Sequence, residues 1–499
     1  MSGIKKLAGQ TIWYGASSIA ARFLNYLLTP YLTATLLSSA YGEMTIIYSA
    51  IPFLNVIFTY GLETAYFRYV QKKEHEEEVY NTATVSLLIS TFFLTAMMIL
   101  LRVPMADLLK IKNHPEFITW SAFIIAFDSL GALAFARLRY EGRPRKFAFI
   151  RIAGIIINIV VTIFFLSVCP RIAAKNPDSF LLIFYNKNVG VGYVLIANLV
   201  QSVFTFILLR KEFFSFRWKF NAKLWRQIMI YSMPLIIAGF GGMINETFDR
   251  IMLAWWSNSP TDAAMKTQVG TYGACYKLSI LITLFVQAFR MGAEPFFFKQ
   301  AQGANPQKVY ARVMKFFVIT VCIMFLAVAL YIDIWKHFLQ NPVYWKGLGV
   351  VPILLFANIF LGIYYNLSIW YKVTNKTMAG AWITLIGAGL TLIINYLFIP
   401  RFGYMACAWA TFFCYGTMMV LSFTWGQKVY RVPYAWKKLL AYMVIVALLF
   451  FIDILFIKAG FGTWINRGFS TSLLLVFIIF VLNIERKEFK QLPFIGKFL

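Results

Sequence analysis

The distribution of apolar residues constrains the fold of this chain more than any other feature. Hydrophobic residues make up 60% of the 499 positions and gather in runs of about twenty, separated by short polar breaks. A helix of that length crosses the hydrocarbon core of a bilayer and satisfies its own backbone hydrogen bonds there. A transmembrane barrel would alternate polar and apolar residues over about ten positions, and these runs do not alternate. The chain is therefore predicted to be an all-α polytopic membrane protein.

The runs predict about fourteen transmembrane helices. In the first half they lie near residues 11–34, 44–67, 80–101, 116–136, 147–169, 189–209 and 227–256. In the second half they lie near 269–290, 310–333, 347–371, 378–399, 403–426, 438–458 and 465–483.

The basic residues give these spans an orientation. If the N-terminus is cytoplasmic, most of the 47 Lys and Arg residues fall in loops on the cytoplasmic side. The positive-inside rule then predicts that both termini are cytoplasmic. Basic loops beside anionic lipids account for much of the net charge of +27, so membrane lipids are expected partners and nucleic acid is not. Residues 210–226 interleave cations with aromatic residues and are predicted to form a helix at the membrane surface.

Two short segments indicate an internal duplication. Gly61–Arg68 and Gly292–Lys299 each combine a Gly, a Glu two residues later, a Phe four residues after that, and then a cation. Each segment ends an apolar run that begins near a glycine, at Gly42 and at Gly270. Six spans separate the start of one repeat from the start of the next, so both halves enter the membrane from the same side. The chain is predicted to contain two parallel-repeat six-helix bundles, as in transporters that move two bundles about a central site.

The predicted organisation has four parts. Residues 1–209 form an N-terminal bundle of spans 1–6, and residues 210–226 form a cytoplasmic basic linker. Residues 227–430 form a C-terminal bundle of spans 7–12, and 431–499 contain spans 13 and 14 with a cytoplasmic tail. The last two spans have no counterpart in the first half and are predicted to be an added helical hairpin.

Cations inside spans are the first candidates for a substrate site, because a charge at the centre of a span is costly and usually faces a cavity or a partner. Arg22 lies among small residues in span 1, and Lys277 has no acidic residue within four positions. Arg290 and Arg250 are further candidates. The alternative for each Arg is a structural ion pair, which for Arg290 would be with Glu294, four residues away on one helix face.

Acidic residues in and near the spans suggest two other roles. The pairs of the repeated motif, Glu63 with Arg68 and Glu294 with Lys299, are predicted to act as a gate or hinge. Span 7 carries two more gate or ion-pair candidates, and helical spacing puts Glu246 on one face with Arg250. Span 7 also contains a Pro and several Gly residues, so it is expected to be the most broken span. The second span 7 candidate is Asp249.

Asp128 and Asp453 are isolated acids inside spans. Either could bind a coupling proton or Na⁺, and the alternative is a hydrogen bond that packs helices together. The chain contains no P-loop and no nucleophile motif. No catalytic residue, metal site or resident cofactor is therefore predicted.

The pattern as a whole resembles one known family. The residues that carry the resemblance are the end of span 7 at Asp249-Arg250, the segment Tyr272–Lys277 and the segment Ala293–Phe298. They resemble the polysaccharide-export, or oligosaccharide-lipid flippase, branch of the multidrug/oligosaccharidyl-lipid/polysaccharide exporter superfamily. The resemblance implies a transporter, not an enzyme, which flips a polyprenyl-pyrophosphate-linked oligosaccharide across a bacterial inner membrane. It also implies a lipid-linked glycan as substrate, and a polysaccharide polymerase and glycosyltransferases as partners.

Three other functions stay open at this point. A multidrug or ion-coupled exporter of the same superfamily would use acidic cavity residues, whereas span 1 carries an Arg. A lipid II flippase would share a cationic cavity. A membrane polysaccharide polymerase or ligase would need a large extracytoplasmic loop with catalytic groups, and the longest such loop, near 170–188, has only Asp178 as an acid.

Overall fold

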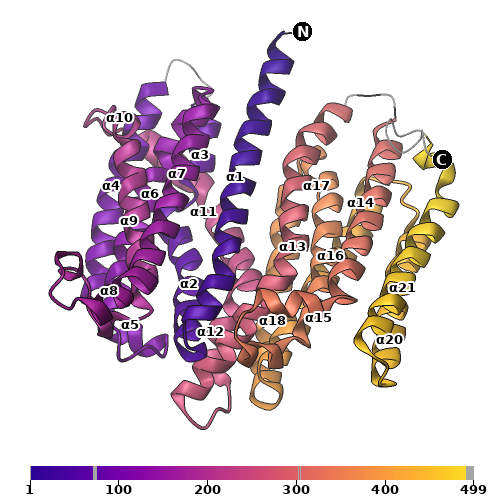
Figure 1. Cartoon of the computed structure of the whole chain (residues 1–499). Helices are drawn as coiled ribbons and strands as arrows, with labels where there is room; N and C mark the ends of the chain where they lie inside the picture. The colour runs from indigo at the N-terminus through magenta and orange to yellow at the C-terminus, as the bar shows by residue number, and fades with distance from the viewer. Residues whose placement is uncertain (1, 71–75, 302, 304, 491–499) are drawn as a thin grey trace. The chain divides into compact units, whose positions relative to one another are not determined.

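The structure is a computed structural model that describes residues 2–70, 76–301, 303 and 305–490, with the side chains of 2–14, 16, 295 and 299 left out. The described chain is almost entirely helical, which confirms the predicted fold class (Figure 1). Twelve helices in the described part are long and apolar enough to cross a membrane. The other two predicted spans fall on α1 and on α9, an apolar helix of 17 residues.

The helices of the first part of the chain begin and end as follows: α1 Ser2–Thr35, α2 Ser38–Thr59, α3 Leu62–Tyr69, α4 Glu76–Leu100, α5 Arg102–Leu108, α6 Glu116–Tyr140, α7 Pro144–Ile163, α8 Cys169–Lys175, α9 Gly192–Leu208, α10 Arg210–Phe213, α11 Ala222–Glu246 and α12 Phe248–Trp256. A π-helical turn at Phe164–Val168 joins α7 to α8 without a break.

The remaining helices are α13 Asp262–Gln300, α14 Pro306–Ala329, α15 Ile332–Trp335, α16 Val350–Leu367, α17 Ile369–Val373, α18 Thr377–Phe402, α19 Tyr404–Val429, α20 Trp436–Lys458, α21 Thr463–Ile484 and α22 Arg486–Phe489.

Packing divides the chain into two compact units. The first unit contains Met1–Ala274, Asn341–Tyr344 and Thr384–Cys414. The second contains Cys275–Gln340, Trp345–Ile383 and Tyr415–Leu499. This division by packing differs from the four-part division expected from the repeats, in which residues 227–274 belong with the C-terminal bundle. The repeat-based division stays a prediction about the origin of the chain.

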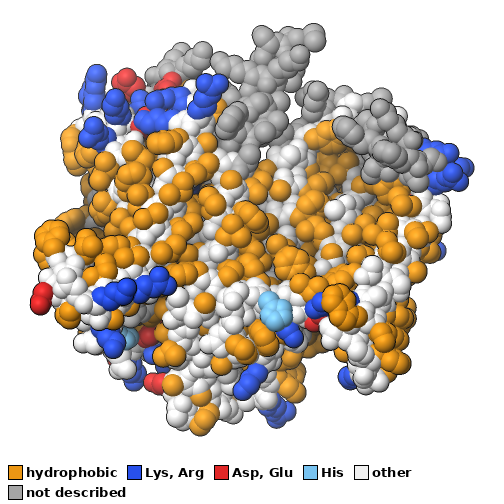
Figure 2. Space-filling model, viewed as in Figure 1, with side chains coloured by type: hydrophobic (Ala, Val, Ile, Leu, Met, Phe, Trp, Pro, Cys, Tyr) orange, Lys and Arg blue, Asp and Glu red, His pale blue; other side chains and the backbone are white. Residues whose placement is uncertain are grey.

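In the first unit, α1 packs against α7, α7 against α9, α9 against α6, and α6 against α4 and α2. Figure 1 shows α3 and α10 at one end of this unit and α5, α8 and α12 at the other. On the face of the unit seen in Figure 2, hydrophobic side chains form a broad belt with Lys and Arg at its two edges. Large apolar side chains such as Phe92, Phe93 and Leu100 are exposed on α4. A hydrocarbon surrounding gives such side chains a favourable environment.

In the second unit, α14 packs against α16, α20 and α21, and α20 packs against α21. The predicted added hairpin therefore corresponds to α20 and α21. Polar contacts hold it to its neighbours at the α15 end, where Arg467 binds Asp333 at 2.9 Å and Tyr331 bonds to Thr471 at 2.8 Å.

The glycines that begin the two motif-bearing runs bring α2 and the first turns of α13 into backbone contact. A Cβ atom on Gly42 would lie 1.7 Å from the carbonyl oxygen of Lys266, and one on Gly270 would lie 2.3 Å from that of Ser38. No side chain fits at either position without a shift of the backbone. Beside this crossing, Lys266 binds the buried carboxylate of Glu43 at 3.1 Å.

Residues 210–226 do not form the single surface helix that the sequence suggested. Only the one-turn α10 forms, and α11 begins at Ala222. Polar side chains of α4 bind the intervening backbone, with Asn81 accepting from the amide of Arg217 at 2.8 Å and Thr82 from that of Asn221 at 3.2 Å. These bonds compete with the helical ladder, so the segment is extended along the end of α4.

Candidate functional site

The glutamates of the repeated motif occupy matching positions in the two compact units. In the first unit Glu63, on α3, forms a salt bridge with Arg139 near the end of α6. In the second unit Glu294, on α13, forms a salt bridge with Lys372 on α17. Arg139 and Lys372 each lie beside a tyrosine at the end of the fourth span of their half. Each motif therefore ties the second span of its half to the fourth.

The aromatic residue three positions after each glutamate is buried in the same way in both units. Tyr66 packs edge-on against Tyr80, with ring centroids 5.9 Å apart. Phe297 packs edge-on against Tyr310 at 5.2 Å. Both motif aromatics are almost fully buried, at 1% and 3% exposure. The two copies thus share a contact pattern as well as a sequence pattern, which supports the predicted duplication.

The two copies differ in their backbone. Gly61 has a positive φ of 73° and separates α2 from α3, whereas Gly292 lies inside the continuous helix α13. A left-handed residue is tolerated best by glycine, which accounts for Gly61 at the break. The cations also differ from the predicted pairing, because the guanidinium of Arg68 stacks over the ring of Tyr231 at 4.2 Å and Glu63 binds Arg139 instead. The side chain of Lys299 lies outside the described residues.

A cluster of charges lies inside the first unit, on α1, α6 and α7. Arg22 and Arg151 are both exposed although they belong to long apolar helices, and Asp128 on α6 is exposed as well. Asp128, Glu63, Arg139 and Arg22 are all close enough to Arg151 to interact with its charge. The guanidinium of Arg151 also lies 4.3 Å from the centre of the Phe135 ring.

Arg151 is a residue that sequence reasoning missed, because its position near the start of a span made it look like a loop cation. The structure puts it in the second turn of α7, beside α1. The signal in the sequence was available, since Arg151 follows Pro144 by seven residues and a Pro commonly begins a helix.

The charges of span 7 form a buried cluster in the first unit, and the predicted pair between Glu246 and Arg250 is wrong. Arg250 donates to the carboxylate of Asp249 at 2.9 Å, and to the backbone carbonyl of Glu246 at 2.8 Å. Asp249 also accepts a bond of 2.5 Å from the hydroxyl of Tyr272. The span breaks at Thr247, between α11 and α12, so the helical spacing of four residues does not hold there.

Span 7 is therefore interrupted, but at Thr247, whereas Pro234 and the glycines on which the expectation rested lie within the continuous helix α11. Arg250 is only 7% exposed and its charge is neutralised by Asp249. Glu246 is exposed at the end of α11. Arg250 is therefore placed to fix the break in span 7, and its predicted role in substrate binding is not supported by any exposed surface of the side chain.

The candidates of the second unit lie on α13 and on the added hairpin. Lys277 is partly buried. Arg290 is 45% exposed, binds Glu294 at 3.0 Å and stacks over Tyr365 at 4.7 Å, so the alternative of a local ion pair describes its contacts. Asp453 is buried and accepts a bond of 2.6 Å from Ser470 on the next span, as the helix-packing alternative expects. Roles of these residues in transport stay predictions.

Two buried carboxylates outside the spans gather cations, and sequence reasoning missed both. In the first unit Glu212, on α10, accepts from Lys146 at 2.6 and 2.8 Å and from Arg143 at 2.8 Å. Burial raises the pKa of a carboxyl, but these cations outweigh it and hold the pKa of Glu212 below its usual value.

The second buried carboxylate is Glu485, at the end of α21. It accepts bonds of 2.8 Å from Lys315, Lys438 and Tyr442, which tie the added hairpin to α14. Burial again raises the pKa of this carboxyl, but the two lysines and the tyrosine hydroxyl outweigh burial and hold the pKa below its usual value. Among the described residues, no group of three His, Cys, Asp or Glu side chains is placed to hold a metal ion.

Comparison with known proteins identifies the family of this chain. The family described as polysaccharide biosynthesis protein matches residues 7–300, more than half of the chain. An uncharacterised membrane protein of Methanocaldococcus jannaschii is 27% identical over 226 residues, which are 43% of this chain and 42% of that protein. The chain thus spans less than half the length of this curated relative.

Solved structures share the fold at low sequence identity. The lipid II flippase MurJ in an inward closed conformation has a TM-score of 0.73 and 14% identity, covering 95% of this chain and 99% of MurJ. A multidrug resistance MATE family transporter of the MOP superfamily, in its inward-facing conformation, has a TM-score of 0.61 and 13% identity, covering 82% of this chain and 94% of that one. The chain therefore belongs to the polysaccharide biosynthesis protein family, and it shares the fold of these flippase and transporter structures.

Proposed function

We propose that this protein flips a polyprenyl-pyrophosphate-linked oligosaccharide across a bacterial inner membrane, with both termini in the cytoplasm. Its family is defined by polysaccharide biosynthesis, and its fold is that of flippases and transporters. The two bundles alternate access to a cationic cavity between the two sides of the membrane. The protein is a transporter and performs no covalent chemistry on the glycan.

The observation that carries the proposal is the pair of exposed arginines inside the first unit. Arg22 and Arg151 are placed on long apolar helices, where a charge is costly, and Asp128 is one of the acids whose charge acts on Arg151. A pyrophosphate group offers several anionic oxygens, and guanidinium groups bind such oxygens with charge-assisted, often paired hydrogen bonds. The arginines lower the cost of moving the head group out of water.

In the second unit, Lys277 and Arg290 are the residues proposed to bind a pyrophosphate head group. Lys277 is partly buried on the long apolar helix α13, where a charge is costly unless it faces a partner or a cavity. To bind the substrate, Arg290 would have to break its salt bridge with Glu294. A gradient of Na⁺ or protons supplies the energy, and Asp128 is the preferred coupling group because it is exposed whereas Asp453 is bound to Ser470.

The proposal is tested by reconstituting the full chain into vesicles with a fluorescent lipid-linked oligosaccharide and measuring its exchange between leaflets, with and without ion gradients. Arg22→Ala, Arg151→Ala and Lys277→Ala should each slow exchange by about tenfold or more, as expected for a lost contact of about 1.5–3 kcal/mol with a charged group. Lys458→Ala, at the far end of α20, is the matched control and should leave exchange unchanged.

Exchange at the wild-type rate in Arg22→Ala and Lys277→Ala, with normal protein levels, would overturn the assignment of these cations to binding of the head group. Faster exchange of lipid II, or efflux of a cationic drug without exchange of the oligosaccharide lipid, would instead identify one of the other transport functions. Polymerase and glycosyltransferase partners are tested by co-purification from the native membrane.

A further inference from the structure

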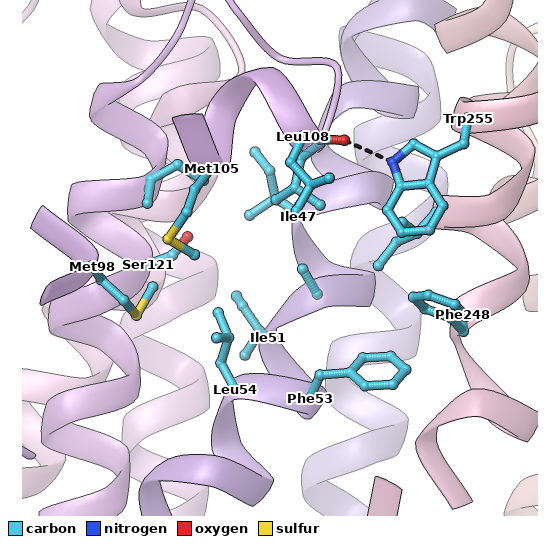
Figure 3. Close-up of a pocket in the computed structure, with 14 residues that line it drawn as sticks. Ile47, Ile51, Phe53, Leu54, Met98, Met105, Leu108, Ser121, Phe248 and Trp255 are labelled. Atoms are coloured by element: carbon cyan, nitrogen blue, oxygen red, sulfur yellow. Dashed lines mark hydrogen bonds between the residues drawn. The ribbon is translucent and has the colours of Figure 1, made fainter. Parts of the chain in front are cut away.

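An apolar pocket of about 230 Å³ lies inside the first unit, among α2, α4, α5, α6 and α12. It is at the end of the unit where α5 and α12 lie, away from the paired motif of α3. Figure 3 shows residues of α2, including Ile47 and Ile51, with Met98 and Met105 on one side and Phe248 and Trp255 on the other. All fourteen lining residues except Ser121 are hydrophobic.

The chemistry of the walls excludes water and favours an apolar occupant. Ser121 is 2% exposed, and its hydroxyl has no hydrogen-bond partner in the described part of the chain. The indole N–H of Trp255 is already donated to the carbonyl of Leu108 at 2.7 Å. A buried water needs two to four polar partners, and an engineered apolar cavity of about 150 Å³ stays dry and binds benzene or xenon. This pocket is larger than that cavity.

The pocket has an exposed leucine at its edge and two flexible methionines in its wall, which would allow a flexible chain to enter. The bond between Trp255 and Leu108 joins α12 to α5 across the pocket, and Leu108 itself is 60% exposed. Met98 and Met105 line the opposite wall. Methionine side chains are unbranched and flexible, so they repack around irregular apolar groups.

Cations lie next to the pocket in the sequence. Arg102 begins α5, and Lys110 and Lys112 follow shortly after its last residue. Anionic lipid head groups are attracted to such clusters near the membrane surface. Together with Asp107 on α5, these three cations leave a net positive charge in the segment that supplies Met105, Leu108 and Leu109 to the pocket wall, which suits an amphiphile with a hydrocarbon chain and an anionic head.

We propose that this pocket binds part of the isoprenoid chain of the anionic carrier lipid. The methyl branches of an isoprenoid give it an irregular apolar outline, and the two flexible methionines of the pocket wall can repack around such branches. This inference rests on the proposed function, because it takes the carrier of the transported glycan as the occupant. The pocket holds a segment of the tail while the head group is bound elsewhere in the transport path.

The test is photo-crosslinking of the full chain in nanodiscs, with a polyprenyl phosphate that carries a diazirine on its chain. Cross-links mapped by mass spectrometry should fall on Met98, Met105 and their neighbours. Ala50→Phe narrows the pocket from the α2 side and should reduce this labelling by about tenfold. Ala96→Phe changes a half-buried alanine of α4 that does not line the pocket, and should leave labelling unchanged.

A second variant covers the case in which Ala50→Phe fails to fold. Ser121→Leu fills the pocket from α6 and removes an unpartnered buried hydroxyl, so the folded protein should be retained while labelling falls. A phosphatidylglycerol with a diazirine on its acyl chain is the competing probe. Equal or stronger labelling of the pocket by this probe would overturn the assignment to an isoprenoid, and so would polyprenyl labelling that is confined to other surfaces.

Leaflet exchange of the oligosaccharide lipid, measured on the same preparations, separates this inference from the proposed function. Pocket labelling by the polyprenyl probe without any exchange would contradict the proposed function and support the site. Exchange at the wild-type rate without pocket labelling would contradict the site and support the proposed function.

Discussion

The buried carboxylate of Glu212 allows a quantitative test of how the first unit is held together. The side chain is 3% exposed and binds Lys146 and Arg143, whereas those cations are 27% and 46% exposed. Breaking a buried ion pair costs about 3–5 kcal/mol when the remaining charge is trapped. Here both cations can turn to water, and a glutamine still accepts one hydrogen bond. Glu212→Gln should therefore lower the free energy of unfolding by about 2–3 kcal/mol.

The chain supplies a matched control for this substitution. Glu141 also binds Arg143, at 3.1 Å, and binds Arg137 at 2.8 Å, but its side chain is 29% exposed. Ion pairs at the surface contribute about 0–1 kcal/mol, so Glu141→Gln should have a small effect. The free energy of unfolding is measured by equilibrium titration with SDS in mixed micelles, followed by circular dichroism. Equal losses in the two variants would refute the reasoning from burial.

The pKa of Glu212 predicts how this difference depends on pH. Because the pKa is lower in the folded protein than its usual value of 4.5, the unfolded chain binds the proton more tightly than the folded one. The stabilisation is therefore complete above about pH 4.5 and is lost as the pH falls through the folded pKa. A difference between wild type and Glu212→Gln that is the same at about pH 7 and about pH 3 would contradict this account.

Three further substitutions test other parts of the structure in the same unfolding assay. Gly42→Ala should cost at least about 1–3 kcal/mol because its Cβ meets the backbone of α13, whereas Gly292→Ala has no neighbour within 4 Å and should be neutral or stabilising by up to about 1 kcal/mol. Glu43→Ala should cost about 3–5 kcal/mol by leaving Lys266 without its acid, and replacing both residues by Leu should restore most of that loss. Glu485→Gln should lower the stability of the second unit at neutral pH and have less effect as the pH falls below about 4.5, since the pKa of Glu485 is also below its usual value. Equal effects of Gly42→Ala and Gly292→Ala, no rescue by the double Leu variant, or a pH-independent effect at Glu485 would each count against the corresponding contact.

The sequence predicted the helices well because their lengths are set by the membrane. Twenty apolar residues in a row have few alternatives to a transmembrane helix, and every predicted span falls on a helix of the structure. The ends were less certain, as at Thr247, where span 7 breaks although neither Pro234 nor the nearby glycines interrupt α11. The break depends on the buried bonds of Asp249 with Arg250 and Tyr272, which come from the fold.

The partners of charged residues could be predicted only in part. Spacing along one helix correctly suggested Arg290 with Glu294, where α13 is continuous. It failed for Glu63, whose partner Arg139 is 76 residues away, because a long-range contact has no local signature. The partner cations Arg139 and Lys372 lie next to Tyr140 and Tyr371 near the ends of α6 and α17, far in the sequence from the glutamates that they bind.

The first unit is built from segments that are far apart in the sequence, so it cannot be completed until most of the chain has been synthesised. That unit includes Thr384–Cys414, and Asn245 donates to the carbonyl of Thr384 at 3.1 Å. At about 5–20 residues per second, a ribosome needs roughly 20–80 s to proceed from the end of α1 to the last residue of this unit. During synthesis the carboxylate of Glu43 has no salt-bridge partner until Lys266 has been made. The polar groups of span 7 lack their hydrogen-bond partners until α18 and α19 have been made.

The early helices therefore stay in the membrane for many seconds with polar groups that lack their final partners. Proteins that hold nascent membrane helices would have time to bind them, and a chain truncated before residue 384 would leave the polar groups of span 7 without their partners on α18 and α19. Quality control of this protein should therefore act late, after most of its helices have been inserted.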